Sequence, residues 1–291
     1  MTAAHPQPPA QQPYAHQQQP YHQQPGGYAY TSPIPLRRAH LGDALASEWT
    51  KIRSVRSTLW TLGVMVVLMV GVGLLAAVAV SASGADLEGQ SILLLGFYGM
   101  LLGSLCVVTL GVLTISSEYG TGMIRTTLTA SPNRSRVLAA KAIVFFLLAF
   151  TVTTVTATVV GMAQSAIVDT GSSTGEEWLR ATVGAGLFVA LLGLLSLAIG
   201  ALVRHSAGAI TVMIGVLLLP LVAAMFMFSE QLETVRQFLF AYSVPSLLVA
   251  FYGDAGLTES GPHGWTPLLI MAGITAVALA GAFLALEKRD V

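Results

Sequence analysis

Histidine, cysteine and clustered carboxylates are the side chains best suited to catalysis or metal binding, and this sequence does not bring them together. The three histidines beyond the N-terminal tail, His40, His205 and His263, fall in separate segments. Acid–base or nucleophilic catalysis needs such groups within hydrogen-bonding reach of one another. The single cysteine, Cys106, lies inside an apolar run, so it can form neither an intramolecular disulfide nor a cysteine cluster. We therefore predict no catalytic residue, no metal site, no bound cofactor and no enzymatic activity.

The most unusual polar segment is ISSEYGTGMIRTTLTASPNRSR, residues 115–136, which separates two long apolar runs. Gly120 and Gly122 permit sharp turns, and Pro132 disfavours a helix at the residue before it. Between these turns the sequence predicts a helix of about two turns with a small apolar face. That face consists of Met123, Ile124, Thr127 and Leu128. It is too small to hold a helix on lipid, so we expect another surface to cover it.

Three basic residues, Arg134, Arg136 and Lys141, follow this segment. We expect them to lie at the lipid interface, where long cationic side chains reach toward the headgroups. A solvated loop that carries only such interfacial charges is the alternative interpretation of the whole segment.

The elements around this segment are membrane spans. The chain of 291 residues is 54% hydrophobic and 10% charged, with a mean hydropathy of +0.71. Crossing a bilayer takes about 20 apolar residues in a helix. Six segments meet this length and contain no Asp, Glu, Lys, Arg or His: 58–80, 92–114, 142–168, 181–203, 209–228 and 265–286. We predict an all-α integral membrane protein with six transmembrane helices.

The basic residues predict the orientation of these spans. Twelve of the fourteen Lys and Arg residues fall on one side, together with both termini. Only Arg180 and Arg236 fall on the other side, which carries nine acidic residues. Because cytoplasmic segments are enriched in Lys and Arg, we expect both termini in the cytoplasm. Trp60, Trp178 and Trp265 stand at span ends, where aromatic rings prefer the interface.

The segment HLGDALASEWTKIRSVRSTLW predicts an amphipathic elbow helix before the first span, within residues 37–57. Its apolar residues recur three or four positions apart: Leu41, Leu45, Trp49, Ile52, Val55 and Leu59. Lys51, Arg53 and Arg56 cluster toward its C-terminal end, where cations suit the helix dipole and anionic lipid. We expect this helix to lie on the inner leaflet and to turn into the span near Ser57 and Thr58.

The N-terminal 36 residues are rich in Pro, Gln and Tyr and contain no charged side chain. Such a composition buries too little apolar surface to fold, so we predict a disordered cytoplasmic tail. A docking role and a metal site at His5, His16 and His22 are weaker alternatives to a dispensable extension. Residues 58–291 then form the six-span domain.

Two other features leave alternatives open. Residues 235–252 contain apolar runs too short to span a membrane, so they form either helices that dip into the outer leaflet or an interfacial helix. The span at 142–168 is rich in threonine, and Thr151, Thr154 and Thr158 either pack between helices or line a polar pathway.

Taken in order, the elbow SEWTKIRSVRST, six spans and the loop SEYGTGMIRTTLTASPNRSRVLAAK resemble the ABC-2 type permeases, in particular the drug and natural-product exporters of actinobacteria. The resemblance covers about residues 41–291. The matching loop positions are an acidic residue, a Gly-Thr pair, a leucine at the end of a short helix, a proline and a basic residue. They correspond here to Glu118, Gly120, Thr121, Leu128, Pro132 and Arg134.

The resemblance implies that the loop is a coupling helix seated on a separate ATP-binding subunit, with Met123, Ile124 and Arg125 on the same helix. It also implies a second permease copy, identical or a sister chain, and a bacterial plasma membrane. The sequence contains no G-x-x-x-x-G-K-[ST] motif, so ATP and Mg²⁺ are expected on the partner ATPase. Membrane lipids are the other expected partner, and no nucleic acid is expected.

Three other function classes compete with this interpretation. Secondary transport is disfavoured because the predicted spans carry no ionisable group for ion coupling. A membrane enzyme is disfavoured because no catalytic cluster forms. A non-transporting membrane protein that recruits a soluble partner through its basic loops fits the composition as well as a permease does.

Overall fold

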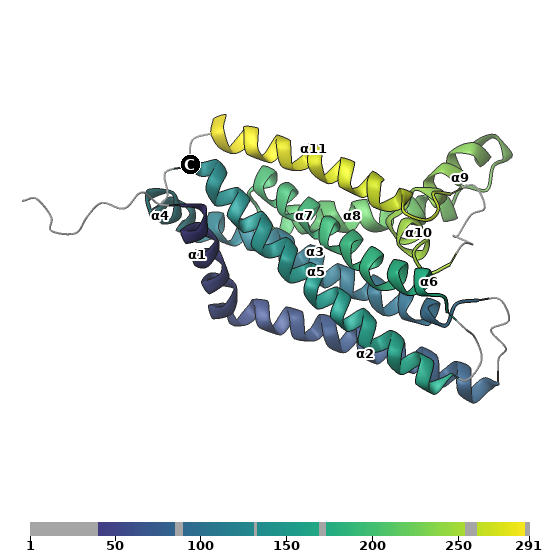
Figure 1. The fold of residues 1–291 in the computed structure, drawn as a ribbon. Helices are drawn as coiled ribbons and strands as arrows, with labels where there is room; N and C mark the ends of the chain where they lie inside the picture. Colours follow the sequence, from purple (N-terminus) through teal and green to yellow (C-terminus); the bar gives the residue numbers. More distant parts are fainter. Residues whose placement is uncertain (1–39, 85–89, 131–132, 169–172, 254–260, 289–291) are drawn as a thin grey trace, which may run out of the picture. The chain divides into compact units, whose positions relative to one another are not determined.

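The computed structural model describes residues 40–84, 90–130, 133–168, 173–253 and 261–288 (Figure 1). The tail at 1–36, the first residues of the predicted elbow and Pro132 lie outside these residues. All regular elements of the described part are helices, and six of them are long and apolar enough to cross a membrane. The chain is therefore a multi-pass membrane protein, as the sequence predicts. The spans are α2 (Arg56–Ser83), η1 with α3 (Ile92–Gly96, Phe97–Gly120), α5 (Arg134–Ile167), α6 with η2 and α7 (Gly175–Leu179, Arg180–Gly184, Ala185–Val203), α8 (Ser206–Met225) and α11 (Thr266–Lys288).

Two spans extend beyond their predicted ends. Helix α3 continues past residue 114 to Gly120 and so includes Glu118, while α5 begins at Arg134 rather than at 142 and so includes Lys141. These helices therefore include residues beyond the predicted membrane-crossing segments, and the facing charges of Glu118 and Lys141 pair there.

Helix α7 occupies the centre of the bundle and packs against α3, α5, α8 and α11. In its most apolar stretch 67% of residues are buried, compared with 17% in α11 and 22% in α2 and α8. The pair α2 and α3 approaches closely at Gly99, where an added Cβ would lie 2.7 Å from the backbone oxygen of Met69. The absence of a side chain at Gly99 is what allows these two helices to pack so closely.

The two ends of the bundle carry different short helices (Figure 1). Helices α1 (Leu41–Ser54) and α4 (Met123–Ala130) lie at the end where α11 terminates, which we call the elbow end. The far end carries α9 (Glu233–Ala241) and α10 (Val244–Val249). Helix α10 is buried throughout and contacts α3 and α8, whereas much of α9 is exposed. Neither can span a membrane, and a dip into the outer leaflet stays a prediction.

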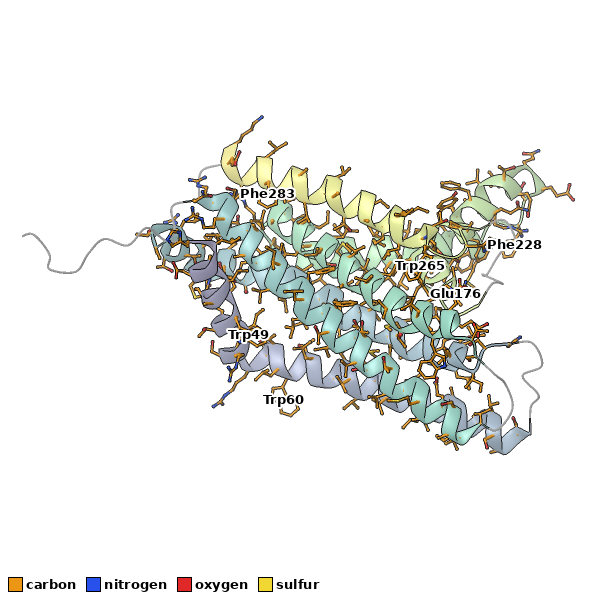
Figure 2. The ribbon with its side chains drawn as sticks, in the orientation of Figure 1. Trp49, Trp60, Glu176, Phe228, Trp265 and Phe283 are labelled. Carbon is orange, nitrogen blue, oxygen red and sulfur yellow. The ribbon has the colours of Figure 1, made fainter. Side chains whose placement is uncertain are left out.

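Helix α1 confirms the predicted elbow, although its turn into α2 comes at Val55, two residues before Ser57. The backbone of Val55 is extended, with φ −85° and ψ 108°, which breaks the helix. The predicted apolar face, including Trp49, is exposed or half-exposed, and the one buried residue of α1 is Glu48. Trp60, 76% exposed, also points away from the bundle (Figure 2). The elbow therefore attaches to the bundle through its polar face.

Candidate functional site

Four charged side chains meet at the elbow end, and we call Glu48, Lys51, Glu118 and Lys141 the charge cluster. The Nζ atom of Lys141 lies 2.7 Å from Oε2 of Glu48 and 2.9 Å from Oε1 of Glu118. The Nζ atom of Lys51 lies 2.7 Å from Oε1 of Glu48 and 2.9 Å from the same Oε1 of Glu118. Two ammonium groups thus alternate with two carboxylates, and the formal charge of the cluster is zero.

Three helices supply these groups: α1 carries Glu48 and Lys51, α3 carries Glu118, and α5 carries Lys141. Helix α4 joins them, because Lys51 also donates a long hydrogen bond of 3.4 Å to Oγ1 of Thr127. The cluster therefore connects the elbow, the second span, the connecting helix and the third span.

The cluster is shielded from solvent. Glu48 and Glu118 are each 4% exposed and Lys141 is 2% exposed. Charges so deeply buried are retained only when they are paired, because removing one partner leaves an uncompensated charge. For Lys51, burial alone would lower the pKa, but hydrogen bonds and charge interactions with Glu48 and Glu118 outweigh it and raise the pKa. Lys51 is therefore cationic at neutral pH.

Two sequence predictions change here. Lys141, expected at the lipid interface, lies about 10 Å along α5 from the first residue of that helix and is enclosed by protein. Lys141 is enclosed because the two carboxylates of the cluster bind its ammonium more tightly than lipid headgroups would. Lys51, expected to face anionic lipid, turns toward the bundle instead. Arg53 and Arg56 are exposed, as the elbow prediction requires.

Helix α4 presents one face to the protein and one away from it. Ile124 is buried, and Thr127 and Leu128 are half-buried against this chain's own helices. For these residues the expected covering surface is supplied by this chain itself, because α4 packs against α3 and α5. Arg125 remains exposed, and so does Met123. The exposed face of α4 consists of Met123, Arg125, Thr126 and Thr129.

The turn before α4 is formed by Gly120, Thr121 and Gly122, all exposed. Gly122 has φ +72°, a left-handed conformation that glycine adopts without strain. Glu118 lies two residues before this turn but points into the cluster. The predicted coupling residues therefore divide into a buried set that fixes α4 and an exposed set that is free to contact a partner.

Two arginines tie the remaining spans together at the elbow end. Arg134 donates a 3.0 Å hydrogen bond from Nη1 to the backbone oxygen of Leu286, which satisfies a carbonyl in the last turn of α11. The guanidinium of Arg204, in the turn between α7 and α8, lies 5.0 Å from the ring centre of Tyr119 on α3. Arg134 is thus engaged within the chain, which the loop resemblance did not indicate.

The threonines of α5 use their hydroxyls mainly within their own helix. Thr158 donates to the backbone oxygen of Thr154, at 2.8 Å, and Thr154 packs against Gly186 of α7. The hydroxyl of Thr154 is buried without a hydrogen-bond partner among the described residues, and pathway lining by Thr151, Thr154 and Thr158 stays a prediction. Deeper in the same helix, Gln164 donates a 3.1 Å hydrogen bond to the backbone oxygen of Gly73, a polar link that the sequence analysis missed.

Comparison with known proteins gives a family and no function. A family model described as a protein of unknown function, DUF2705, matches residues 64–291. This match begins within α2, after the elbow helix, and covers the other five spans in full. No curated protein matches the sequence.

Proposed function

The chain belongs to the DUF2705 family, and we propose that it is the transmembrane permease subunit of an ATP-driven transporter. It exports an amphipathic or lipid-like compound and is energised by a separate ATP-binding subunit. It lies in the bacterial plasma membrane, with the elbow end and both termini in the cytoplasm. It works with a second permease copy, either identical or a sister chain.

The observation that supports this proposal is the way in which α4 is held against the bundle. Its inner face is fixed by burial of Ile124 and by the bond from Lys51 to Thr127, and its outer face is exposed. A helix held on one side and exposed on the other can receive a push from a soluble partner. A solvated loop, the alternative interpretation, would not need a buried anchor.

The charge cluster connects α4 and α1 to two membrane-spanning helices, so it can transmit such a push to them. Glu118 stands near the end of α3 and Lys141 near the start of α5, so a displacement of α4 and α1 moves both spans together. Coupling between sites travels through contiguous packed and hydrogen-bonded groups. A transporter that alternates between two arrangements needs such a rigid connection from the motor to the spans.

The motor itself comes from another chain, because the sequence contains no phosphate-binding P-loop motif. ATP and Mg²⁺ are bound by that partner, and this chain supplies the pathway. Uncharged central spans suit a cargo with large apolar surface better than a strongly ionic solute.

The test is affinity purification of the tagged full-length protein from its native membrane in mild detergent, with identification of the proteins that co-purify. We expect a stoichiometric protein with a P-loop. The Arg125→Glu variant reverses one charge on the exposed face of α4 and should capture at least about tenfold less of it, since like charges at an interface cost several kcal/mol. Lys288→Glu makes the same change at the exposed end of α11, and this control should capture the normal amount.

Two results would contradict the proposal. Reproducible absence of a P-loop protein, with the six-span protein intact, would favour the recruiting-partner function. Equal capture by Arg125→Glu and wild type would show that α4 is not the contact.

A further inference from the structure

A groove opens beside the charge cluster, between α1, the first turns of α2 and the last turns of α3. Its volume is about 430 Å³, and all four charged residues of the cluster contribute to its lining. The apolar part of its wall consists of Ile52, Val55, Leu110 and Leu113. A single water needs only about 10–15 Å³, whereas small-molecule sites occupy about 300–1,000 Å³. The groove is therefore large enough for an organic group.

One polar atom beside this groove lacks a partner. Glu118 accepts both lysines on Oε1, while its other oxygen, Oε2, is buried and has no hydrogen-bond partner among the described residues. Both oxygens of Glu48 are paired, and Lys51 already donates to three acceptors, the number of its ammonium hydrogens. Lys141 donates to two acceptors, so the unused capacity among the described residues is one acceptor, Oε2 of Glu118, and one ammonium hydrogen of Lys141. A hydroxyl, which both donates and accepts, matches this pair. A buried carboxylate oxygen without a donor is costly, so a donor at this position is favoured.

Three hydroxyls of the groove offer acceptors. Thr61 donates to the backbone oxygen of Ser57 at 2.9 Å, Thr114 to that of Leu110 at 2.7 Å, and Ser117 to that of Leu113 at 2.6 Å. Each of these three hydroxyls donates its only hydrogen within its own helix and keeps lone pairs that can accept a hydrogen bond. A ligand that donates hydrogen bonds fits these acceptors.

Charge decides between a neutral and a cationic donor. The cluster sums to zero, so a cation brought beside it would be a desolvated charge without a matching anion. A hydroxyl supplies the missing hydrogen without adding charge. Oε2 is itself covered, so the ligand's approach requires adjustment of the lining, for which the flexible side chain of Met123 in the groove wall is suited.

From these observations we infer that the groove binds a neutral membrane amphiphile with a free hydroxyl head, of the acylglycerol class, supplied by the leaflet at the elbow end. The hydroxyl donates to Oε2 of Glu118, and the first carbons of the acyl chain lie against Leu110 and Leu113. This leaflet is the source because the groove lies where α2 begins and α3 ends, between exposed Trp60 and the elbow. The inference concerns binding by this chain alone and does not depend on transport.

The test uses the full-length protein in phospholipid nanodiscs and a monoacylglycerol with a photoactivatable diazirine in its acyl chain. Labelled residues are mapped by mass spectrometry. Labelling should concentrate at residues 57–61 and 110–117. Among competitors with one twelve-carbon chain, monolaurin should compete at least about tenfold better than methyl laurate, which has no donor, because a hydrogen bond to a charged group is stronger than one between neutral groups. Laurate and dodecylammonium should compete as weakly as the ester.

A pair of variants separates the groove from general lipid contact. Leu113→Trp fills the groove without removing a charge and should reduce labelling at least about tenfold, in line with loss of the site. Leu102→Trp makes the same change at an exposed position of α3 outside the groove and should leave labelling unchanged. Neither variant changes the charge cluster, so the comparison does not depend on the cluster's role in folding.

Three outcomes would overturn the inference. Labelling spread evenly over exposed span residues would mean that the groove holds water only. Equal competition by methyl laurate would remove the role of the donor, and stronger competition by dodecylammonium or laurate would show that charge governs the site. Each outcome is independent of whether an ATPase co-purifies, so it leaves the proposed function untouched.

Discussion

Replacing Lys141 by methionine removes one cation from the charge cluster while keeping the length of the side chain. Lys51 still pairs with Glu48 and Glu118, but Oε2 of Glu48 loses its donor and the cluster acquires one net negative charge. The elbow helix α1 is attached to the bundle through this cluster. We therefore expect α1 to detach more often in this variant while the spans stay folded.

The free-energy cost of the Lys141→Met substitution has an upper limit. Breaking a buried ion pair by deleting one partner costs about 3–5 kcal/mol. The cluster can instead take up a proton on one carboxylate. A glutamate in water has a pKa of about 4.3, so protonation at pH 7 costs roughly 2.7 × 1.36, or about 3.7 kcal/mol. The cheaper of these two responses sets the cost. We therefore expect the free energy that holds α1 on the bundle to fall by about 3–4 kcal/mol at pH 7 and by only about 1 kcal/mol at pH 5.

Hydrogen exchange of residues 41–54 measures this loss directly, as protection factors corrected for the intrinsic exchange rate. A change of 3–4 kcal/mol lowers protection by about two to three orders of magnitude, since 1.4 kcal/mol corresponds to a factor of ten. The defect should shrink by about tenfold for each pH unit from 7 to 5. The double variant Lys141→Met with Glu48→Met restores neutrality and leaves the pair of Lys51 and Glu118, so it should recover at least half of the lost free energy.

Three results would refute the reasoning. A loss of protection below tenfold at pH 7 would mean that the cluster does not hold the elbow. A defect independent of pH would exclude proton uptake as the compensation. A double variant no better than the single one would show that the lost contact is packing by the lysine stem rather than charge balance.

Three further predictions concern other contacts of the same structure. Because the pKa of Lys51 is raised, its contribution is complete below the unfolded value of about 10.4 and is lost as pH rises through the folded value. The difference in α1 protection between wild type and Lys51→Met should therefore stay constant from about pH 8 to 9 and shrink above about 10.5, while proton uptake by the cluster reduces it below pH 7. Gly99→Ala places a Cβ 2.7 Å from the backbone oxygen of Met69 and should destabilise the bundle by about 1–3 kcal/mol in detergent unfolding, whereas Gly63→Ala, with nothing within 4 Å, should not. Arg134→Met removes the donor to the end of α11 and should speed exchange in the last turn of that helix by about tenfold, with α2 as the unaffected reference.

The membrane architecture is predictable because its cause is local. Six runs of about 20 apolar residues suffice to satisfy the backbone in lipid, whatever the neighbouring helices are. The elbow is equally local, since Leu41, Leu45, Trp49 and Ile52 show the helical period directly. The structure confirms both elements, with shifts of a few residues at their ends.

The ends of α3 and α5 were not predictable by the same means, because their cause is a contact between distant residues. Glu118 and Lys141 are 23 positions apart, and Glu48 and Lys141 are 93 apart. Read singly, each charge marks the edge of a span, since an isolated charge in lipid costs about 2.5–3.5 kcal/mol. Read as a set, they include two acids and two bases at neighbouring span ends, which is the composition of a neutral buried cluster.

One sequence signal could have indicated this cluster. In a helix, Glu48 and Lys51 are three residues apart and so lie on one face. That pair forms a polar face, distinct from the apolar stripe, on an elbow whose remaining basic residues, Arg53 and Arg56, are exposed. An acidic residue directly at an anionic membrane surface is unfavourable, so Glu48 required a cationic partner from the bundle.

The placement of Glu48 also separates two ways in which an elbow can work. An elbow held by lipid alone would respond to membrane composition, because its attachment energy would come from headgroups and acyl chains. This elbow buries its carboxylate against Lys141 and exposes Trp49 and Arg53, so its attachment is set by the protein and only its outer face responds to lipid. A shift of α4 is then carried to α1 through the bond from Lys51 to Thr127, and from α1 to α5 through the bond from Lys141 to Glu48. Rigid transfer of that kind is what a motor acting on α4 requires.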